Sequence, residues 1–176
     1  MHRDIEKILV SEGQIKDRVK ELACDVLAKG EEDIMIVILL KGALVFAADL
    51  FRQMPIKLDV ECLNISSYHG GMESSGKVDF LDKSLPDFTG KRVIVVDDIF
   101  DTGLTMKVVC DEIAKRGAES VESCVLLAKE KERDVDYEPN YVGFVIGNEF
   151  VVGYGLDYRG KYRNLPCIGV LCEAAI

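Results

Sequence analysis

Two patterns of apolar residues alternate along the chain. Continuous apolar runs, such as Ile34–Leu40 and residues 92–97, predict strands that are buried on both faces. Ser11 and Gln14 form a capping-box pattern, after which apolar residues recur at helical spacing as far as position 27. Gly30 is placed to end that helix.

The same two patterns continue to the C-terminal third. They predict helices over 43–52 and 104–116, and strands over 58–63, 121–127, 141–146 and 151–152. Strands separated by helices imply βαβ units and a mostly parallel, twisted sheet flanked by helices. We therefore expect one α/β domain over residues 1–176, with ligands bound at the carboxyl ends of the strands.

Composition narrows the class of partner. Of the 176 residues, 48% are hydrophobic and 30% are charged, as in an ordinary globular domain. The net charge of −9 argues against nucleic acid or an anionic membrane as the main partner, because both require a basic surface. A small-molecule ligand remains, since local amides, lysines or a metal can bind it whatever the net charge.

The cysteines and the N-terminus add two expectations. The six cysteines form no CxxC pair, and most lie in apolar runs, so we expect buried, reduced thiols rather than metal ligands or disulfides. The N-terminus is charged, unlike a signal peptide, and no apolar run reaches the roughly 18 residues that span a bilayer. We expect a cytoplasmic protein.

The most informative chemistry follows the strand at 92–97. This strand ends in Asp97 and Asp98, and a Thr102-Gly103-Leu104-Thr105 turn then opens the next helix. Backbone amides at such a helix start can hold a phosphate, and carboxylates accept hydrogen bonds from sugar hydroxyls. A site for a phosphorylated sugar follows; solvated loop residues, or Mg²⁺ ligands of a receiver-type domain, are the alternatives.

Three other segments have both a functional and a plain structural interpretation. The polar, glycine-rich stretch 66–77 is either a lid or the tip of a hairpin. Lys129 ends a predicted strand and is either a ligand-binding or a surface lysine. The aromatic stretch 150–158 is either part of a ligand site or an edge strand.

Taken whole, the segment 92–105 resembles the phosphoribosyl-diphosphate signature of the type I phosphoribosyltransferases. That signature is an apolar strand, two acidic residues, two further residues and Asp-Thr-Gly-x-Thr. Together with Lys129 and the stretch 150–166, it makes residues 34–171 similar to the hypoxanthine-guanine phosphoribosyltransferases. The resemblance implies the type I fold with a small C-terminal, base-binding hood, and a homodimer or homotetramer. It also implies transfer of a 5-phosphoribosyl group to a 6-oxopurine in purine salvage, with Mg²⁺ as cofactor.

The resemblance also implies a role for each site residue. The residues implied to bind the phosphoribosyl group are Asp97, Asp98, Asp101, Thr102, Gly103, Leu104 and Thr105, with Asp101 as the general base. Pyrophosphate binding falls to Lys41, Gly42, Ser67, Tyr68 and Arg163, often through a cis peptide at the first of these positions. Purine binding falls to Lys129, Phe150, Val151, Ile99 and Asp157. The Mg²⁺ ligands are Asp157, Asp97 and Asp98.

Two alternatives stay open within this fold. One is a phosphoribosyltransferase for xanthine or another base, and the other is a non-catalytic regulator that binds RNA. The lysine at 129 has donors only, so it favours a 6-oxo over a 6-amino purine and predicts that adenine is rejected. Hypoxanthine is the expected preferred base, because it demands nothing at the 2-position.

Overall fold

The central element is a six-stranded sheet of order β4-β3-β2-β5-β6-β7. The computed structural model describes residues 2–67, 78–81, 84–131, 135–172 and 175. In chain order the strands of this sheet are β2 (Ile34–Leu40), β3 (Asp59–Ser67), β4 (Val78–Phe80), β5 (Arg92–Phe100), β6 (Ser120–Lys129) and β7 (Tyr141–Ile146). All neighbours pair in parallel except β4, which pairs antiparallel with β3. The predicted mostly parallel sheet is confirmed.

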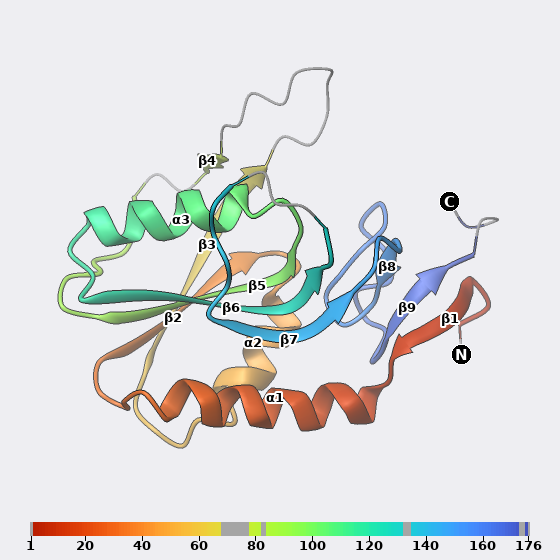
Figure 1. Cartoon of the computed structure of the whole chain (residues 1–176), viewed down its shortest axis with the longest axis horizontal. Helices are drawn as coiled ribbons and strands as arrows, with labels where there is room; N and C mark the ends of the chain where they lie inside the picture. The colour runs from red at the N-terminus through yellow and green to blue at the C-terminus, as the bar shows by residue number, and fades with distance from the viewer. Residues whose placement is uncertain (1, 68–77, 82–83, 132–134, 173–174, 176) are drawn as a thin grey trace.

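Helices cover both faces of the sheet (Figure 1). Helices α1 (Glu12–Leu27) and α2 (Leu44–Phe51) lie on one face, and α3 (Leu104–Lys115) lies on the other. The predicted helices are confirmed to within a few residues. The capping box at the start of α1 is also present, because the Ser11 amide donates to Gln14 Oε1 at 2.9 Å and the Gln14 amide donates to Ser11 Oγ at 3.4 Å.

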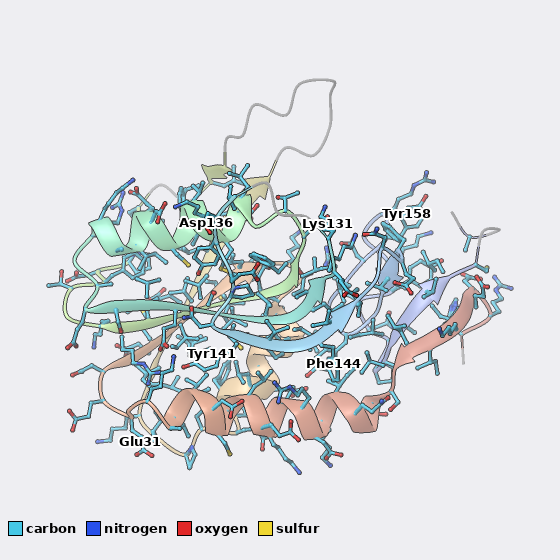
Figure 2. The ribbon with its side chains drawn as sticks, in the orientation of Figure 1. Glu31, Lys131, Asp136, Tyr141, Phe144 and Tyr158 are labelled. Carbon is cyan, nitrogen blue, oxygen red and sulfur yellow. The ribbon has the colours of Figure 1, made fainter. Side chains whose placement is uncertain are left out.

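A buried ionic cluster ties the end of α1 to the amino ends of the strands. Arg92 Nη2 lies 2.7 Å from Glu122 Oε2, and Tyr141 and Lys29 reach the other oxygen at 3.1 and 2.5 Å. Arg92 also donates to the carbonyls of Val26 and Gly30, at 2.9 and 2.6 Å, at the carboxyl end of α1 and just beyond it. Figure 2 labels Tyr141 in the space between the sheet and α1.

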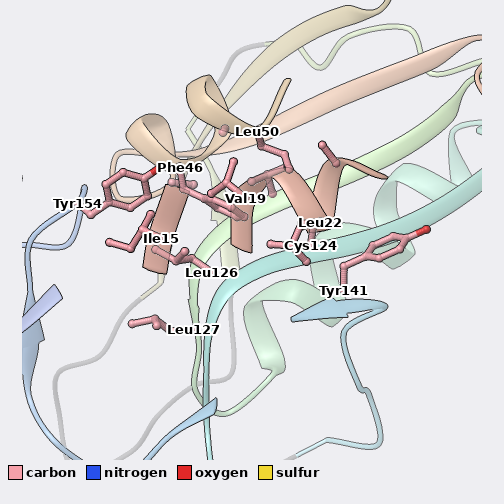
Figure 3. Packing of buried hydrophobic residues seen from close by; sticks show 14 of the residues in the cluster. Ile15, Val19, Leu22, Phe46, Leu50, Cys124, Leu126, Leu127, Tyr141 and Tyr154 are labelled. Atoms are coloured by element: carbon pink, nitrogen blue, oxygen red, sulfur yellow. The ribbon is translucent and has the colours of Figure 1, made fainter. Parts of the chain in front are cut away.

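The apolar runs are continuous because both faces of the sheet are covered. In β2, Ile34, Ile36 and Ile38 pack in the cluster under α1 and α2, whereas the residues between them pack in the cluster under α3. Figure 3 shows the first cluster, where side chains of α1, α2 and β6 interdigitate. The sheet is thereby held between two layers, which fixes the carboxyl ends of its strands in space.

A second, three-stranded sheet lies beyond those carboxyl ends. Its order is β1-β9-β8, formed by β1 (Ile5–Val10), β9 (Ile168–Leu171) and β8 (Val151–Val152). We call this sheet, with the connecting segment 153–167, the hood. Tyr162 OH donates to Asp4 Oδ2 at 2.8 Å and joins that segment to the start of the chain. The predicted hood is thus present, but it is not only C-terminal, because β1 supplies one of its edges.

Two expectations about exposure can be compared with the structure. Only Cys110 and Cys124 are buried, and Cys24 and Cys62 are exposed, so the prediction that most thiols are buried is wrong. Cys24 and Cys62 lie on elements that have one side facing solvent. Apolar residues next to them in the sequence do not show which side each thiol is on. All six cysteines are free. Within the described ranges, no helix is both long and apolar enough to cross a membrane.

Candidate functional site

A cavity of about 430 Å³ opens at the carboxyl ends of β2, β5 and β6, beside the hood. It brings together most of the residues predicted to bind a ligand. Those that line it are Lys41, Gly42, Asp97, Asp98, Ile99, Asp101, Thr102, Gly103, Thr105, Lys129, Phe150, Val151, Asp157 and Arg163. Leu104 does not line it, although its amide opens α3 nearby.

Asp97 and Asp98 lie inside strand β5 rather than after it. The prediction that this strand ends at residue 97 is wrong, because pairing with β6 continues to Phe100. Burial raises the pKa of both carboxyls, and the neighbouring Asp98 carboxylate raises the pKa of Asp97 further. Two such carboxyls are suited to a ligand that brings hydrogen-bond donors or positive charge.

The loop from Asp101 to the start of α3 exposes backbone amides to the cavity. Gly103 is the N-cap of α3 with φ +85°, and a β-carbon there would lie 2.9 Å from the ring of Phe100 and 3.1 Å from Val135. Glycine is therefore required both by conformation and by space. Thr102 Oγ1 accepts a 3.4 Å hydrogen bond from the Leu104 amide. The amides at a helix start of this kind can bind a phosphate group.

The segment Lys41-Gly42 forms the opposite wall. The peptide bond between Leu40 and Lys41 is cis. Gly42 packs against the carboxylate of Asp98 so closely that a β-carbon would overlap with it. On its other side, the carbonyl oxygen of Gly42 lies where a β-carbon of Gly155 would be. Glycine at both positions lets the hood approach the acidic pair.

Arg163 links the hood segment to the cavity. Its Nη2 lies 2.6 Å from Asp157 Oδ1, and its Nη1 donates to the Gly155 carbonyl at 2.5 Å. The other oxygen of Asp157 accepts from the Gly160 amide at 2.6 Å. These contacts hold a positive and a negative side chain in fixed positions in the wall of the cavity.

Lys129 and Asp101 form an ion pair in the wall of the cavity. The Lys129 ammonium lies 3.8 Å from Asp101 Oδ2. Phe150 also lines the cavity and is 48% exposed, with its ring edge-on to Tyr158 at 5.5 Å between centroids. An exposed aromatic ring and a donor-only side chain in one cavity suit a flat heterocycle with an acceptor oxygen.

Two predicted residues cannot be compared in the same way. Tyr68 lies outside the described residues, and only the backbone of Ser67 is described, as the last residue of β3. Conversely, Met106, Glu149 and Leu156 line the cavity but were not predicted. Glu149 adjoins Phe150 in sequence and Leu156 lies within the stretch 150–158, so both had a usable signal, whereas Met106 comes from a helix position that is typical of an ordinary core.

No described set of three or more His, Cys, Asp or Glu side chains is arranged to hold a metal ion. The carboxylates of Asp97, Asp98 and Asp157 nevertheless line one cavity. Mg²⁺ is commonly held by one or two carboxylates together with water and substrate phosphates, rather than by an all-protein cage. The donor set therefore fits Mg²⁺ that arrives with a diphosphate.

Comparison with known proteins gives consistent results. The sequence profile of the phosphoribosyl transferase domain matches residues 7–159. The hypoxanthine-guanine phosphoribosyltransferase of Streptococcus pneumoniae is 42% identical over 175 residues, which cover 98% of this chain and 97% of that protein. The bifunctional protein TilS/HprT of Listeria monocytogenes is 42% identical over 172 residues, but the chain spans only 26% of its length.

A solved structure resembles the whole fold. The crystal structure of a hypoxanthine phosphoribosyltransferase from Staphylococcus aureus superposes with a TM-score of 0.93 at 38% sequence identity. The match covers 99% of this chain and 96% of that one. The hood and the central sheet therefore both belong to a known architecture.

Proposed function

The chain belongs to the phosphoribosyl transferase family, and from that premise we propose that it is a hypoxanthine-guanine phosphoribosyltransferase. It transfers the 5-phosphoribosyl group of phosphoribosyl diphosphate to a 6-oxopurine and releases pyrophosphate. The products are the nucleoside monophosphates of purine salvage. Relatives of this activity at about 40% identity over nearly the whole chain support the proposal.

One observation carries the assignment to this cavity. The acidic pair, the start of α3 and the Lys129–Phe150 end all line a single cavity of about 430 Å³. These three features match, in order, a ribose, a 5-phosphate and an oxopurine. A site of this kind holds both substrates with the reacting atoms close together, which is the main requirement of a two-substrate transfer.

In the proposed mechanism, the bond between the anomeric carbon and the diphosphate oxygen breaks as the purine nitrogen attacks. Asp97 and Asp98 accept hydrogen bonds from the ribose hydroxyls and offset the positive charge that develops on the ring. The amides at the start of α3, with the hydroxyls of Thr102 and Thr105, hold the 5-phosphate in place. The leaving pyrophosphate is bound by Lys41, Gly42 and Arg163, together with Ser67 and Tyr68.

The purine is held and deprotonated at the other end. Lys129 donates to the 6-oxo oxygen, Phe150 and Ile99 stack on the two faces of the ring, and the Val151 backbone reads its edge. Asp101 accepts the proton that the purine loses as the new bond forms. Adenine presents an amino group to the Lys129 ammonium and is rejected, because two donors then face each other.

We further propose that Mg²⁺ is held by Asp157 and the acidic pair together with the diphosphate. Bound there, it would neutralise charge on the leaving group. From the sequence and the family resemblance we also propose a cytoplasmic enzyme with one catalytic domain. It would act as a homodimer or homotetramer on small molecules rather than on nucleic acid or membranes.

The test is a steady-state comparison of hypoxanthine, guanine, xanthine and adenine, each with phosphoribosyl diphosphate and Mg²⁺, with pyrophosphate release as the readout. We expect turnover with hypoxanthine and guanine and none with adenine. The same panel with Lys129→Ala should lose selectivity against adenine. A preference for xanthine would indicate the alternative base specificity, and no turnover combined with RNA binding would indicate the regulator.

A further inference from the structure

A second lysine contacts Asp101. Lys131 follows the end of β6, and its Nζ lies 2.5 Å from Asp101 Oδ1. Lys129 Nζ is more distant, 3.8 Å from the other oxygen, Oδ2. Figure 2 labels Lys131 near the carboxyl end of β6, on the side toward the hood. No role proposed above involves Lys131, and it does not line the cavity.

The two contacts divide the Asp101 carboxylate between two cations. Oδ1 is shielded from solvent, and the Lys131 ammonium lies beside it. Lys131 itself is only 32% exposed, which limits the screening of this pair by water. Oδ2 is the oxygen that stays on the side of Lys129, where the purine is proposed to bind.

Binding of the purine changes what Lys129 contacts, whereas Lys131 stays paired with Asp101. In the proposed mechanism Lys129 donates to the 6-oxo oxygen, so its attraction for Asp101 is shared with the ligand. Were Lys129 the sole cation near Asp101, the carboxylate would lose much of its counter-charge just before it must accept a proton. Lys131 keeps that counter-charge at Oδ1 while Oδ2 is left for the purine.

We propose that Lys131 is a positioning residue for Asp101: the ion pair at Oδ1 holds the carboxylate turned so that Oδ2 faces the purine. This inference rests on the proposed function and extends it. Lys131 touches neither substrate, and its effect on catalysis passes through Asp101 alone. Its contribution should therefore vanish when Asp101 cannot act as a base.

A double-mutant cycle tests this dependence, with the single-turnover rate of nucleotide formation from hypoxanthine as the readout. Lys131→Gln should slow this rate about tenfold, within the range of coupling measured between contacting charged residues. In the Asp101→Asn background the same substitution should change the rate by less than about twofold. Lys131→Arg, which keeps the charge, should restore most of the rate.

Lys91→Gln is the matched control. Lys91 has a similar exposure of 29% and pairs with Asp59 at 3.0 Å, but it lies at the amino ends of the strands, away from the cavity. The single-turnover rate of the Lys91→Gln variant should equal that of the unmodified protein. An unchanged rate in Lys131→Gln, or an equal loss in both backgrounds, would overturn the inference while the proposed function stands. An unmodified protein without transferase activity would overturn both.

Discussion

Gly155 packs directly on the carbonyl oxygen of Gly42, at a separation that leaves no room for a β-carbon. Gly42 in turn packs on the carboxylate of Asp98. The hood, the Lys41-Gly42 segment and the acidic pair therefore form one stack, in which the position of each depends on the next. A displacement at Gly155 should therefore weaken the binding of phosphoribosyl diphosphate.

Gly155→Ala should accordingly raise the KM for phosphoribosyl diphosphate about tenfold or more, because the new methyl group pushes the segment at Gly42 out of place. Its φ of +105° adds backbone strain of order 1–3 kcal/mol. Gly90→Ala is the control, since Gly90 also has a positive φ of +68° but open space around it. Gly90→Ala should lower the free energy of unfolding and leave the KM unchanged. Equal KM values in the two variants would contradict the stack.

Asp101→Asn should lower turnover by about 10²–10⁴-fold, the usual contribution of general acid–base catalysis. The KM for phosphoribosyl diphosphate should change far less, because amides at the start of α3 are proposed to hold the phosphate. Steady-state kinetics with each substrate varied in turn separates the two effects. Turnover that survives in the Asn variant would remove Asp101 from the proton transfer.

Phe150→Ala should raise the KM for hypoxanthine by about 5- to 150-fold, the range that stacking of a base on an aromatic side chain supports. Thermal stability should barely change, because the ring is already 48% exposed. Val145→Ala removes another exposed apolar side chain, one that is 66% exposed and does not line the cavity, and it should leave KM unaltered. The comparison uses calorimetry and initial rates, and a matching KM in both variants would argue against stacking.

Glu122→Gln should lower the free energy of unfolding at pH 7 by about 1.5–3 kcal/mol, measured by urea denaturation, because hydrogen bonds to a charged group are weakened. Burial raises the pKa of Glu122, but hydrogen bonds from Lys29 and Arg92 outweigh it and hold the pKa below its usual value. A carboxyl with a lowered folded-state pKa stabilises the protein above its unfolded pKa of about 4.3 and loses this effect as pH falls. The difference between the two proteins should thus be constant above about pH 5 and shrink below it. A difference that persists at low pH would show that the charge is not its source.

The parts of the fold that the sequence predicts are those whose burial is local and two-sided. Strand β2 is recognisable because helices cover both of its faces, so every position is apolar. Strands β1 and β9 are not, since β1 has few buried residues, β9 is only four residues long, and each depends on a partner at the other end of the chain. The sequence predicts too early an end for β5, because carboxylates such as Asp97 and Asp98 are unusual within a buried strand. Both of them line the cavity.

The candidate site also has one part that the sequence predicts and one part that it does not. The acidic pair and the turn at Gly103 lie in one short stretch, so their shared chemistry is readable from sequence. The contacts of Lys131 with Asp101 and of Gly155 with Gly42 join separate elements. Such contacts are fixed by tertiary packing, and spacing along the chain carries no trace of them.

The pairing of β1 with β9 has a consequence for synthesis on the ribosome. Ile5 pairs with Leu171, so β1 is synthesised long before the strand that satisfies its backbone. The start of α3 and the strands around it can assemble earlier, from neighbouring segments. A nascent chain should therefore form the acidic pair and the start of α3 before the hood, with β1 open to chaperones in the interval.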